Sequence, residues 1–248
     1  MRSPLALIAE SAKTYKTDFP TFIGYSAWLL FPFAVFVLLD FLPDSPIVNV
    51  LEVILIIAEL CLYVWIALIL MLFAKARIKN EAIDSTLLPQ KAKQLIQPVL
   101  LIAVLQFLML VGGFILLIVP FFIFAVWFGL AQFTTVFENK RGLESLSASR
   151  ALSKGRFWKT ANRIIVGPLL LMVGYYILLA LVISLLTAIQ GVDPIELLAG
   201  EVPLWINVVE AIGQLFYVPI HVIYLTHVYL ELTSTHATAP PEESCDIA

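Results

Sequence analysis

The stretch 97–137 constrains this chain most, because it runs for 41 positions without a charged residue. About 20 apolar residues are enough to cross a bilayer, so this stretch alone has the length of two crossings. Across the whole sequence, 61% of residues are hydrophobic and only 13% are charged, whereas an ordinary soluble domain is nearer half apolar and a quarter charged. These proportions exclude a soluble enzyme, a nucleic-acid-binding protein and a secreted disulfide scaffold, and they predict a polytopic membrane protein.

The apolar runs predict six transmembrane helices in one all-α membrane helix bundle. We divide the stretch 97–137 near Ile118–Pro120, because proline readily begins a helix, and Gly112 and Gly113 would let the two helices approach closely. The bundle forms a single integral membrane domain over 1–231, and the acidic cytoplasmic tail 232–248 has a composition typical of disorder. The expected spans are about 21–42, 48–74, 98–117, 120–137, 166–190 and 204–230.

Two more helices are expected outside the spans. Residues 3–18 read as an amphipathic helix, with Ser3 as a good N-cap and Pro4 at the first helical position. This helix either packs beneath the bundle or lies in the membrane interface. A second, basic amphipathic helix is expected in the loop 138–161 between the fourth and fifth spans. The apolar face of the first helix would be Leu5, Ile8, Ala9, Ala12, Tyr15 and Phe19.

The 15 Lys and Arg residues occur in three clusters, which predict the orientation of the chain. Cationic loops stay in the cytoplasm, whereas acidic residues have little influence on orientation. We therefore expect a multi-pass protein of the cytoplasmic (inner) membrane with both termini in the cytoplasm and an even number of crossings between clusters. The clusters are Arg2, Lys13 and Lys16; then Lys75, Arg77, Lys79, Lys91 and Lys93; then Lys140, Arg141, Arg150, Lys154, Arg156, Lys159 and Arg163.

Polar side chains recur along one face of the sixth span, at steps of three and four residues. Polar groups that face hydrocarbon are costly, so this polar seam must face other helices or water. It acts either as hydrogen-bonding glue between helices or as the lining of a polar cavity or conduction path. The residues of the polar seam are Asn207, Glu210, Gln214, Tyr217, His221 and Tyr224.

Glu59 is the most unusual acid in the chain. It lies near the midplane of the second span, seven residues after Glu52 and on the same face. No Lys or Arg lies at that depth, so we expect Glu59 to be protonated or hydrogen-bonded to another polar side chain. Glu210 and Gln214 lie at comparable depth, which suits either a proton relay or a polar packing contact.

The third basic cluster mixes cations with apolar and aromatic residues. One interpretation is that it only sets the topology. The sharper one is that it binds anionic lipid headgroups, with each cation contributing roughly 1 kcal/mol near a charged leaflet. The candidate lipid-contact residues are Lys140, Arg141, Arg150, Lys154, Arg156, Trp158 and Lys159.

Signals of catalysis are poor. The three histidines have no metal-ligand spacing with a second cluster, and no Gly-rich phosphate loop or G-x-S-x-G motif occurs. We therefore expect no catalytic residues, no metal and no cofactor, and a protein that is not an enzyme.

The region from Gly113 to Lys159 resembles a known family. Residues 113–120, GFILLIVP, are similar to its Gly-x-x-Leu-Leu-x-x-Pro-Gly segment, although Phe121 stands where the family usually has Gly. Residues 137–159 are similar to its Glu-x-x-x-Gly, Ala-Leu-x-x-Ser-x-x-Leu and Lys-Gly-x-Phe-Trp pattern. This is a broad prokaryotic family of six-span membrane proteins, largely uncharacterised, related to the membrane domain of glycerophosphodiester phosphodiesterases. The resemblance implies a helical membrane domain without the soluble phosphodiesterase part and its metal-binding residues.

Two functions are compatible with these observations. The first is a non-enzymatic integral membrane protein that organises lipid or partner proteins through its basic inner loop and its N-terminal helix. The second is a small transporter or channel component that uses Glu59 and the polar seam. The expected partners are the lipid bilayer, its anionic headgroups and proteins that the sequence does not identify, with no nucleic acid.

Overall fold

A computed structural model describes residues 2–43, 45–82, 84–116, 118–191 and 202–237. Every regular element within these residues is a helix, and none is a strand. The helices are α1 (Pro4–Thr17), α2 (Phe19–Ser26), η1 (Ala27–Leu29), α3 (Leu30–Leu39), α4 (Pro46–Lys79), α5 (Leu88–Leu116), α6 (Ile118–Phe128), α7 (Ala131–Glu138), α8 (Leu143–Ser153), α9 (Phe157–Ala161), η2 (Asn162–Val166), α10 (Gly167–Gln190) and α12 (Leu204–Ala237).

Six helical segments in the described residues are long and apolar enough to cross a membrane, which confirms the all-α polytopic prediction. The division of the stretch 97–137 also falls where proline predicted it, since α5 ends at Leu116 and α6 begins at Ile118. At the hairpin, a Cβ on Gly113 would lie 2.9 Å from the Phe124 side chain, so the two helices approach closely there. The same expectation for Gly112 was wrong, because a Cβ on that residue would meet nothing within 4 Å. The candidate spans are Phe19–Leu39, Pro46–Lys79, Leu88–Ile115, Val119–Glu138, Phe157–Gln190 and Leu204–His236.

Several helices extend beyond the predicted spans. The third begins at Leu88 rather than near 98, and the fifth at Phe157 rather than near 166. Hydropathy locates the apolar core of a span, whereas backbone hydrogen bonds continue the helix through polar residues at its end. The α12 helix likewise continues past 230 to Ala237, and the tail 238–248 lies outside the described residues.

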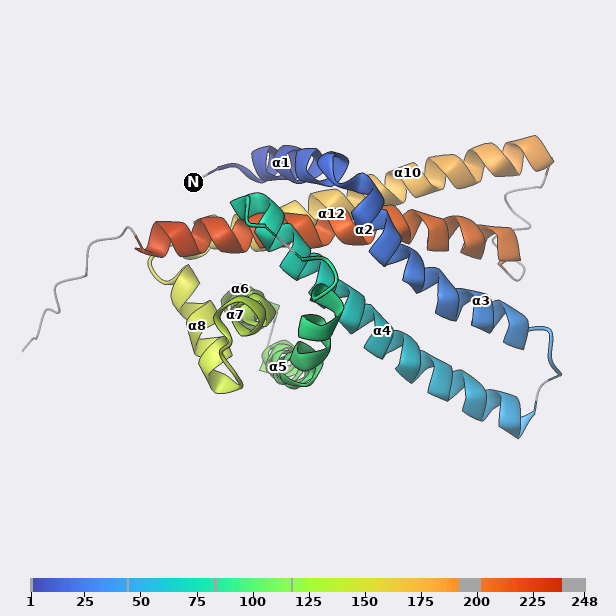
Figure 1. The fold of residues 1–248 in the computed structure, drawn as a ribbon, viewed down its shortest axis with the longest axis horizontal. Coiled ribbons are helices and arrows are strands. Elements are labelled where there is room, and N and C mark those ends of the chain that lie inside the picture. The colour runs from blue at the N-terminus through green and yellow to red at the C-terminus, as the bar shows by residue number, and fades with distance from the viewer. Residues whose placement is uncertain (1, 44, 83, 117, 192–201, 238–248) are drawn as a thin grey trace, which may run out of the picture.

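The helices do not all run in one direction. Figure 1 shows α10 and α12 lengthwise and close together, while α5 and α6 are seen end-on and therefore cross them steeply. The pair α3 and α4 diverges from α12 toward the turn that joins them. Within the first span, the helix is irregular just before α3. Pro32 has no N–H to donate to the carbonyl of Trp28, and this carbonyl belongs to the 3₁₀ turn η1.

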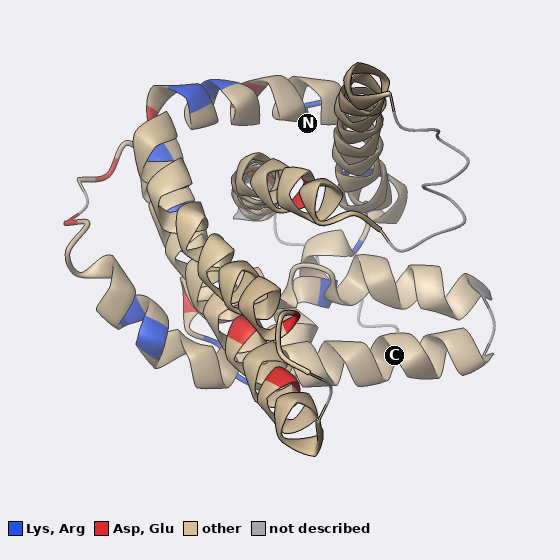
Figure 2. Ribbon diagram, turned by 90° about the vertical axis from the view of Figure 1, so that its right-hand side faces the viewer, with Lys and Arg blue, Asp and Glu red and all other residues tan. Residues whose placement is uncertain are grey.

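The three basic clusters lie at one end of the bundle, which we call the basic end: α1, residues 66–79 of α4, the start of α5, residues 138–163 and residues 215–237 of α12. Arg77 of α4 pairs with Asp18 at the end of α1, with 2.6 Å between Nη2 and Oδ1. Lys75 donates to the carbonyl of Phe137 at 3.5 Å, and Arg163 donates to the carbonyl of Arg2. Figure 2 shows the Lys and Arg positions as blue segments of the ribbon on the N-terminal helix and on the nearby helices. An even number of crossings between the clusters requires all three to lie on the same side of the membrane, as they do here. That this side faces the cytoplasm stays a prediction.

The hydrophobic core also lies at the basic end. In α4 the buried side chains run from Ile66 to Ala76, apart from Val48 near the start of the helix, and in α12 from Leu215 to Leu232. Fully buried Leu7 of α1 and Phe22 of α2 pack into the same cluster. Farther out, α3, α4 and α10 expose large apolar side chains, as expected for helices that contact lipid.

The N-terminal helix packs against the bundle, chiefly against α12. Ser3 caps it as predicted, accepting from the backbone N–H of Ala6 at 3.2 Å. Its buried side chains are Leu7, Ser11 and Tyr15, whereas Leu5 is 68% exposed. The predicted apolar face was therefore partly wrong. Ser11 can be buried although it is polar, because its hydroxyl donates to the Leu7 carbonyl at 2.7 Å within the same helix. Burial raises the pKa of the Tyr15 phenol to about 12.

Candidate functional site

Helix α8 is fixed to the bundle by a face of small hydroxyl side chains. Ser145, Ser149 and Ser153 recur every four residues and are buried. Thr135 of α7 donates its hydroxyl to Ser145 Oγ at 2.9 Å, and Thr134 donates to the Ser145 carbonyl at 3.1 Å. Ser153 donates within α8, and Ser149 Oγ has no partner among the described residues, so the hydrogen bonds from α7 hold this face at Ser145. Because the serine face is buried, the opposite face of α8 has a defined direction.

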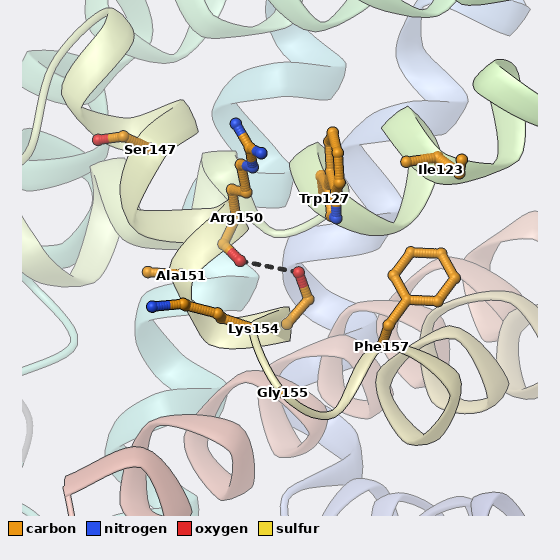
Figure 3. A pocket seen from close by; sticks show the side chains of 9 residues that line it. Ile123, Trp127, Ser147, Arg150, Ala151, Lys154, Gly155 and Phe157 are labelled. Atoms are coloured by element: carbon orange, nitrogen blue, oxygen red, sulfur yellow. Dashed lines mark hydrogen bonds between the residues drawn. The ribbon is translucent and has the colours of Figure 1, made fainter. Parts of the chain in front are cut away.

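The opposite face of α8 borders a cleft of about 650 Å³, which we call the cationic cleft. Arg150 and Lys154 lie four residues apart on this exposed face and both line the cleft. The facing wall comes from α6, which belongs to the fourth span, and from the start of α9. The lining residues are Ile123, Trp127, Ser147, Arg150, Ala151, Ser153, Lys154, Gly155 and Phe157 (Figure 3).

The Arg150 side chain contacts Trp127 within the cleft, and its backbone accepts a local hydrogen bond. Its guanidinium carbon lies 4.1 Å from the centroid of the Trp127 ring, a cation–π distance. Its backbone carbonyl accepts the Ser153 hydroxyl at 2.8 Å. Figure 3 shows the guanidinium beside the indole, with Phe157 and Ile123 on the apolar side of the cleft. The sequence interpretation missed Trp127 and Ile123, although a tryptophan near a membrane interface is a known signal.

The seven candidate lipid-contact residues do not form one site. Only Arg150 and Lys154 line the cationic cleft. Lys140 pairs with Glu138 at 2.6 Å, and Arg156 donates to the Thr235 carbonyl of α12 at 3.3 Å. The remaining three, Arg141, Trp158 and Lys159, are exposed, and Trp158 is 82% exposed. In the sequence they lie within a few residues of those that line the cleft.

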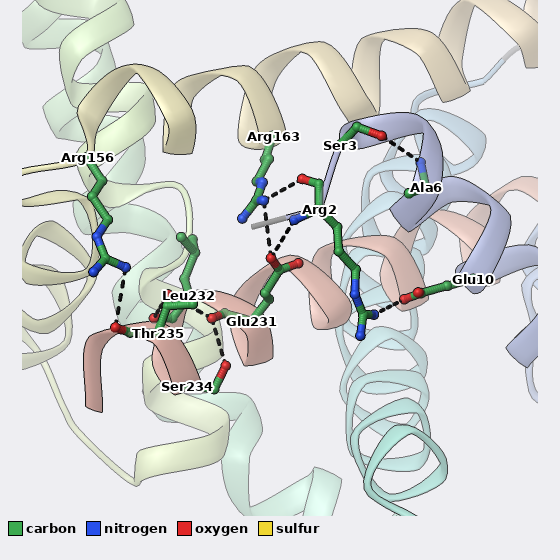
Figure 4. A network of polar contacts seen from close by, with 10 residues as sticks. All are labelled: Arg2, Ser3, Ala6, Glu10, Arg156, Arg163, Glu231, Leu232, Ser234 and Thr235. Atoms are coloured by element: carbon green, nitrogen blue, oxygen red, sulfur yellow. Dashed lines mark hydrogen bonds and ion pairs between the residues drawn. The ribbon is translucent and has the colours of Figure 1, made fainter. Parts of the chain in front are cut away.

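Arg163, the last cation of the third cluster, is structural. It is only 3% exposed and lies 3.2 Å from the Glu231 carboxylate of α12. Glu231 also accepts the backbone N–H of Arg2 at 2.8 Å, so the N-terminus is held in the same network (Figure 4). The Arg163 carbonyl lies in the π-helical turn η2 and accepts the Tyr224 hydroxyl at 2.9 Å. The π-turn therefore presents a backbone acceptor to the polar seam.

The inner half of the polar seam packs against other polar groups. Tyr217 Oη lies 3.3 Å from His221 Nδ1. The Tyr217 ring also stacks on Tyr175 of α10, with centroids 4.8 Å apart. The Tyr217–His221 pair lies within α12, whereas the stacking on Tyr175 and the Tyr224 contact to η2 join α12 to other helices. These two contacts fit the interpretation of the seam as glue between helices.

The outer half of the polar seam lines a cavity, which we call the polar cavity. Its volume is about 280 Å³, and Glu59 lies in its wall. Among the residues that the structure describes, the side chains of Glu59, Asn207, Glu210 and Gln214 have no hydrogen-bond or ion-pair partner. The remaining wall residues are Leu29, Phe33 and Ala211. The outer seam therefore does not act as glue in this structure.

The described residues hold no group of three or more His, Cys, Asp or Glu side chains that could bind a metal ion. No family model, no curated protein and no solved structure matches the chain. The relationship to the membrane domain of glycerophosphodiester phosphodiesterases therefore stays a prediction from the resemblance.

Proposed function

We propose that this integral membrane protein is not an enzyme and that its basic end binds the anionic surface of a bilayer, organising lipid or lipid-bound partner proteins around it. The supporting observation is that Arg141, Lys159 and Trp158 remain exposed, whereas Lys140, Arg156 and Arg163 of the same cluster have polar partners within the protein. Two cations and an indole beside a membrane span suit the headgroup region. Each cation near a charged leaflet contributes roughly 1 kcal/mol.

The test is the composition of lipid that the full chain retains from mixed phosphatidylcholine and phosphatidylglycerol nanodiscs. The double variant Arg141→Gln/Lys159→Gln removes two exposed cations, so the enrichment of phosphatidylglycerol should fall roughly tenfold or more. The charge-preserving pair Arg141→Lys/Lys159→Arg is the matched control and should retain the enrichment. Unchanged enrichment in the neutralised variant overturns the proposal.

The polar cavity favours a second candidate function, a transporter or channel component. Four polar side chains converge there without satisfying one another, which leaves room for water or a small polar ligand. In proteoliposomes, Glu59→Gln should then reduce a proton or cation flux more than His221→Ala, because His221 lies in the paired half of the seam. Equal effects of the two variants, or no flux at all, contradict this function.

A further inference from the structure

We infer that the cationic cleft is a stoichiometric site for one anionic phospholipid. Arg150 and Lys154 would bind its phosphate, and Ile123, Trp127 and Phe157 would contact its glycerol and upper acyl chains. This inference rests on the proposed function and deepens it, because it replaces a diffuse charged surface by one discrete site. A volume of about 650 Å³ lies within the range of roughly 300–1,000 Å³ usual for ligand pockets.

The cations of the cleft suit a phosphate group. A guanidinium presents a planar fork of N–H donors that matches phosphate oxygens, and an ammonium adds a mobile point charge. In the described part of the chain, the Arg150 guanidinium contacts the Trp127 ring but has no hydrogen-bond or ion-pair partner. Since the contact with the Trp127 ring uses none of the guanidinium N–H groups as hydrogen-bond donors to oxygen, these groups remain able to donate.

The apolar wall distinguishes a lipid from a free phosphate. Ile123, Trp127 and Phe157 offer an aliphatic and two aromatic surfaces, which a small anion would leave uncovered. These side chains come from α6 of a membrane span and from the start of the next span, whereas the cations come from α8 outside the spans. A molecule with an anionic head and an apolar body fits this arrangement, with its head at the cations and its body along the apolar wall.

The test uses the full chain in phosphatidylcholine nanodiscs that contain a minority of phosphatidylglycerol, with the retained lipids counted by native mass spectrometry. Ala151→Trp places an indole in the cleft and leaves every cation in place. It should reduce the occupancy of one tightly retained phosphatidylglycerol by about tenfold or more. Ala9→Trp, on the exposed face of α1 at the same basic end, is the matched control and should retain that lipid.

Arg150→Gln tests the headgroup contact and should also remove the retained phosphatidylglycerol, whereas Trp127→Phe keeps an aromatic wall and should retain most of it. The double variant Arg141→Gln/Lys159→Gln should lower general enrichment but keep this one lipid, so the failure of the surface proposal and the failure of the cleft site give different results. If Ala151→Trp retains the lipid, or if phosphatidylcholine occupies the site equally well, the inference is overturned.

Discussion

The two ends of this molecule have similar apolar helices but very different packing. At the basic end, α4 buries Leu70 and α12 buries Ile223 completely. In the outer part of the same helices, Leu60 is 57% exposed and Ile212 is 46% exposed. Hydropathy alone does not separate these positions, because a side chain that contacts lipid is as apolar as one that contacts another helix.

Polar side chains differ between the two ends in the same way. At the basic end, Thr135 donates to Ser145 and Tyr224 donates to the backbone of η2. In the outer part, Asn207 and Glu210 face the polar cavity without a partner for their side chains among the described residues. The paired groups at the basic end therefore fix the structure there, although Tyr15 Oη and Ser149 Oγ are buried without a partner among the described residues. The polar groups in the cavity are available to water or a ligand.

The largest effect is expected from Arg163→Met at the basic end. The variant leaves the half-buried Glu231 carboxylate without its guanidinium, and breaking such a pair costs about 3–5 kcal/mol of unfolding free energy. Reversible unfolding in mixed micelles measures this loss. The double variant Arg163→Met/Glu231→Met should be more stable than the single one, and a single variant as stable as the parent contradicts the assigned role.

The next effect compares two leucines of α4. Leu70→Ala removes a fully buried side chain and should cost about 2–5 kcal/mol. Leu60→Ala, ten residues earlier, exchanges lipid contacts in both folded and unfolded chains and should change the unfolding free energy by less than ~1 kcal/mol. Equal losses for the two variants would show that the outer part of α4 is packed in the membrane.

A smaller difference is expected between two glycines of α10. A Cβ on Gly167 would lie 1.8 Å from the Tyr224 hydroxyl, whereas a Cβ on Gly174 would meet nothing within 4 Å. Gly167→Ala should therefore destabilise the fold by about 1–3 kcal/mol through overpacking, and Gly174→Ala should be neutral or slightly stabilising. Thermal unfolding in detergent compares them, and a harmless Gly167→Ala contradicts the close contact of α10 and α12.

The smallest effect is expected in the polar cavity. Thr135→Val at the basic end loses a buried hydrogen bond and should cost about 0.5–1.5 kcal/mol. Gln214→Leu removes a side chain that has no partner among the described residues and should change stability by less than ~0.5 kcal/mol. Chemical unfolding of both variants tests this contrast, and a clear loss for Gln214→Leu indicates that the outer seam does act as glue.

Much of the fold was predictable because hydropathy and helix-end signals are local. Pro120 and the length of 97–137 predicted the hairpin, and Ser3 predicted the start of α1. The buried face of α1 was predicted less well, because Ser11 satisfies its own hydroxyl within the helix. From depth alone we expected Glu59 to lie near Glu210 and Gln214, but the sequence left open whether these groups pack together or surround a cavity, as they do with Asn207 in the structure.

By itself, the sequence determined the helices, their approximate spans and the clustering of positive charge, since each depends on residues near one another in the chain. Only the tertiary structure decided which polar groups are paired. Arg163 and Arg150 belong to one basic cluster, yet Arg163 is buried on Glu231 and Arg150 lies on Trp127 in the cationic cleft. The two arginines differ in burial because burial depends on which helix packs against each side chain. That packing joins residues far apart in the chain.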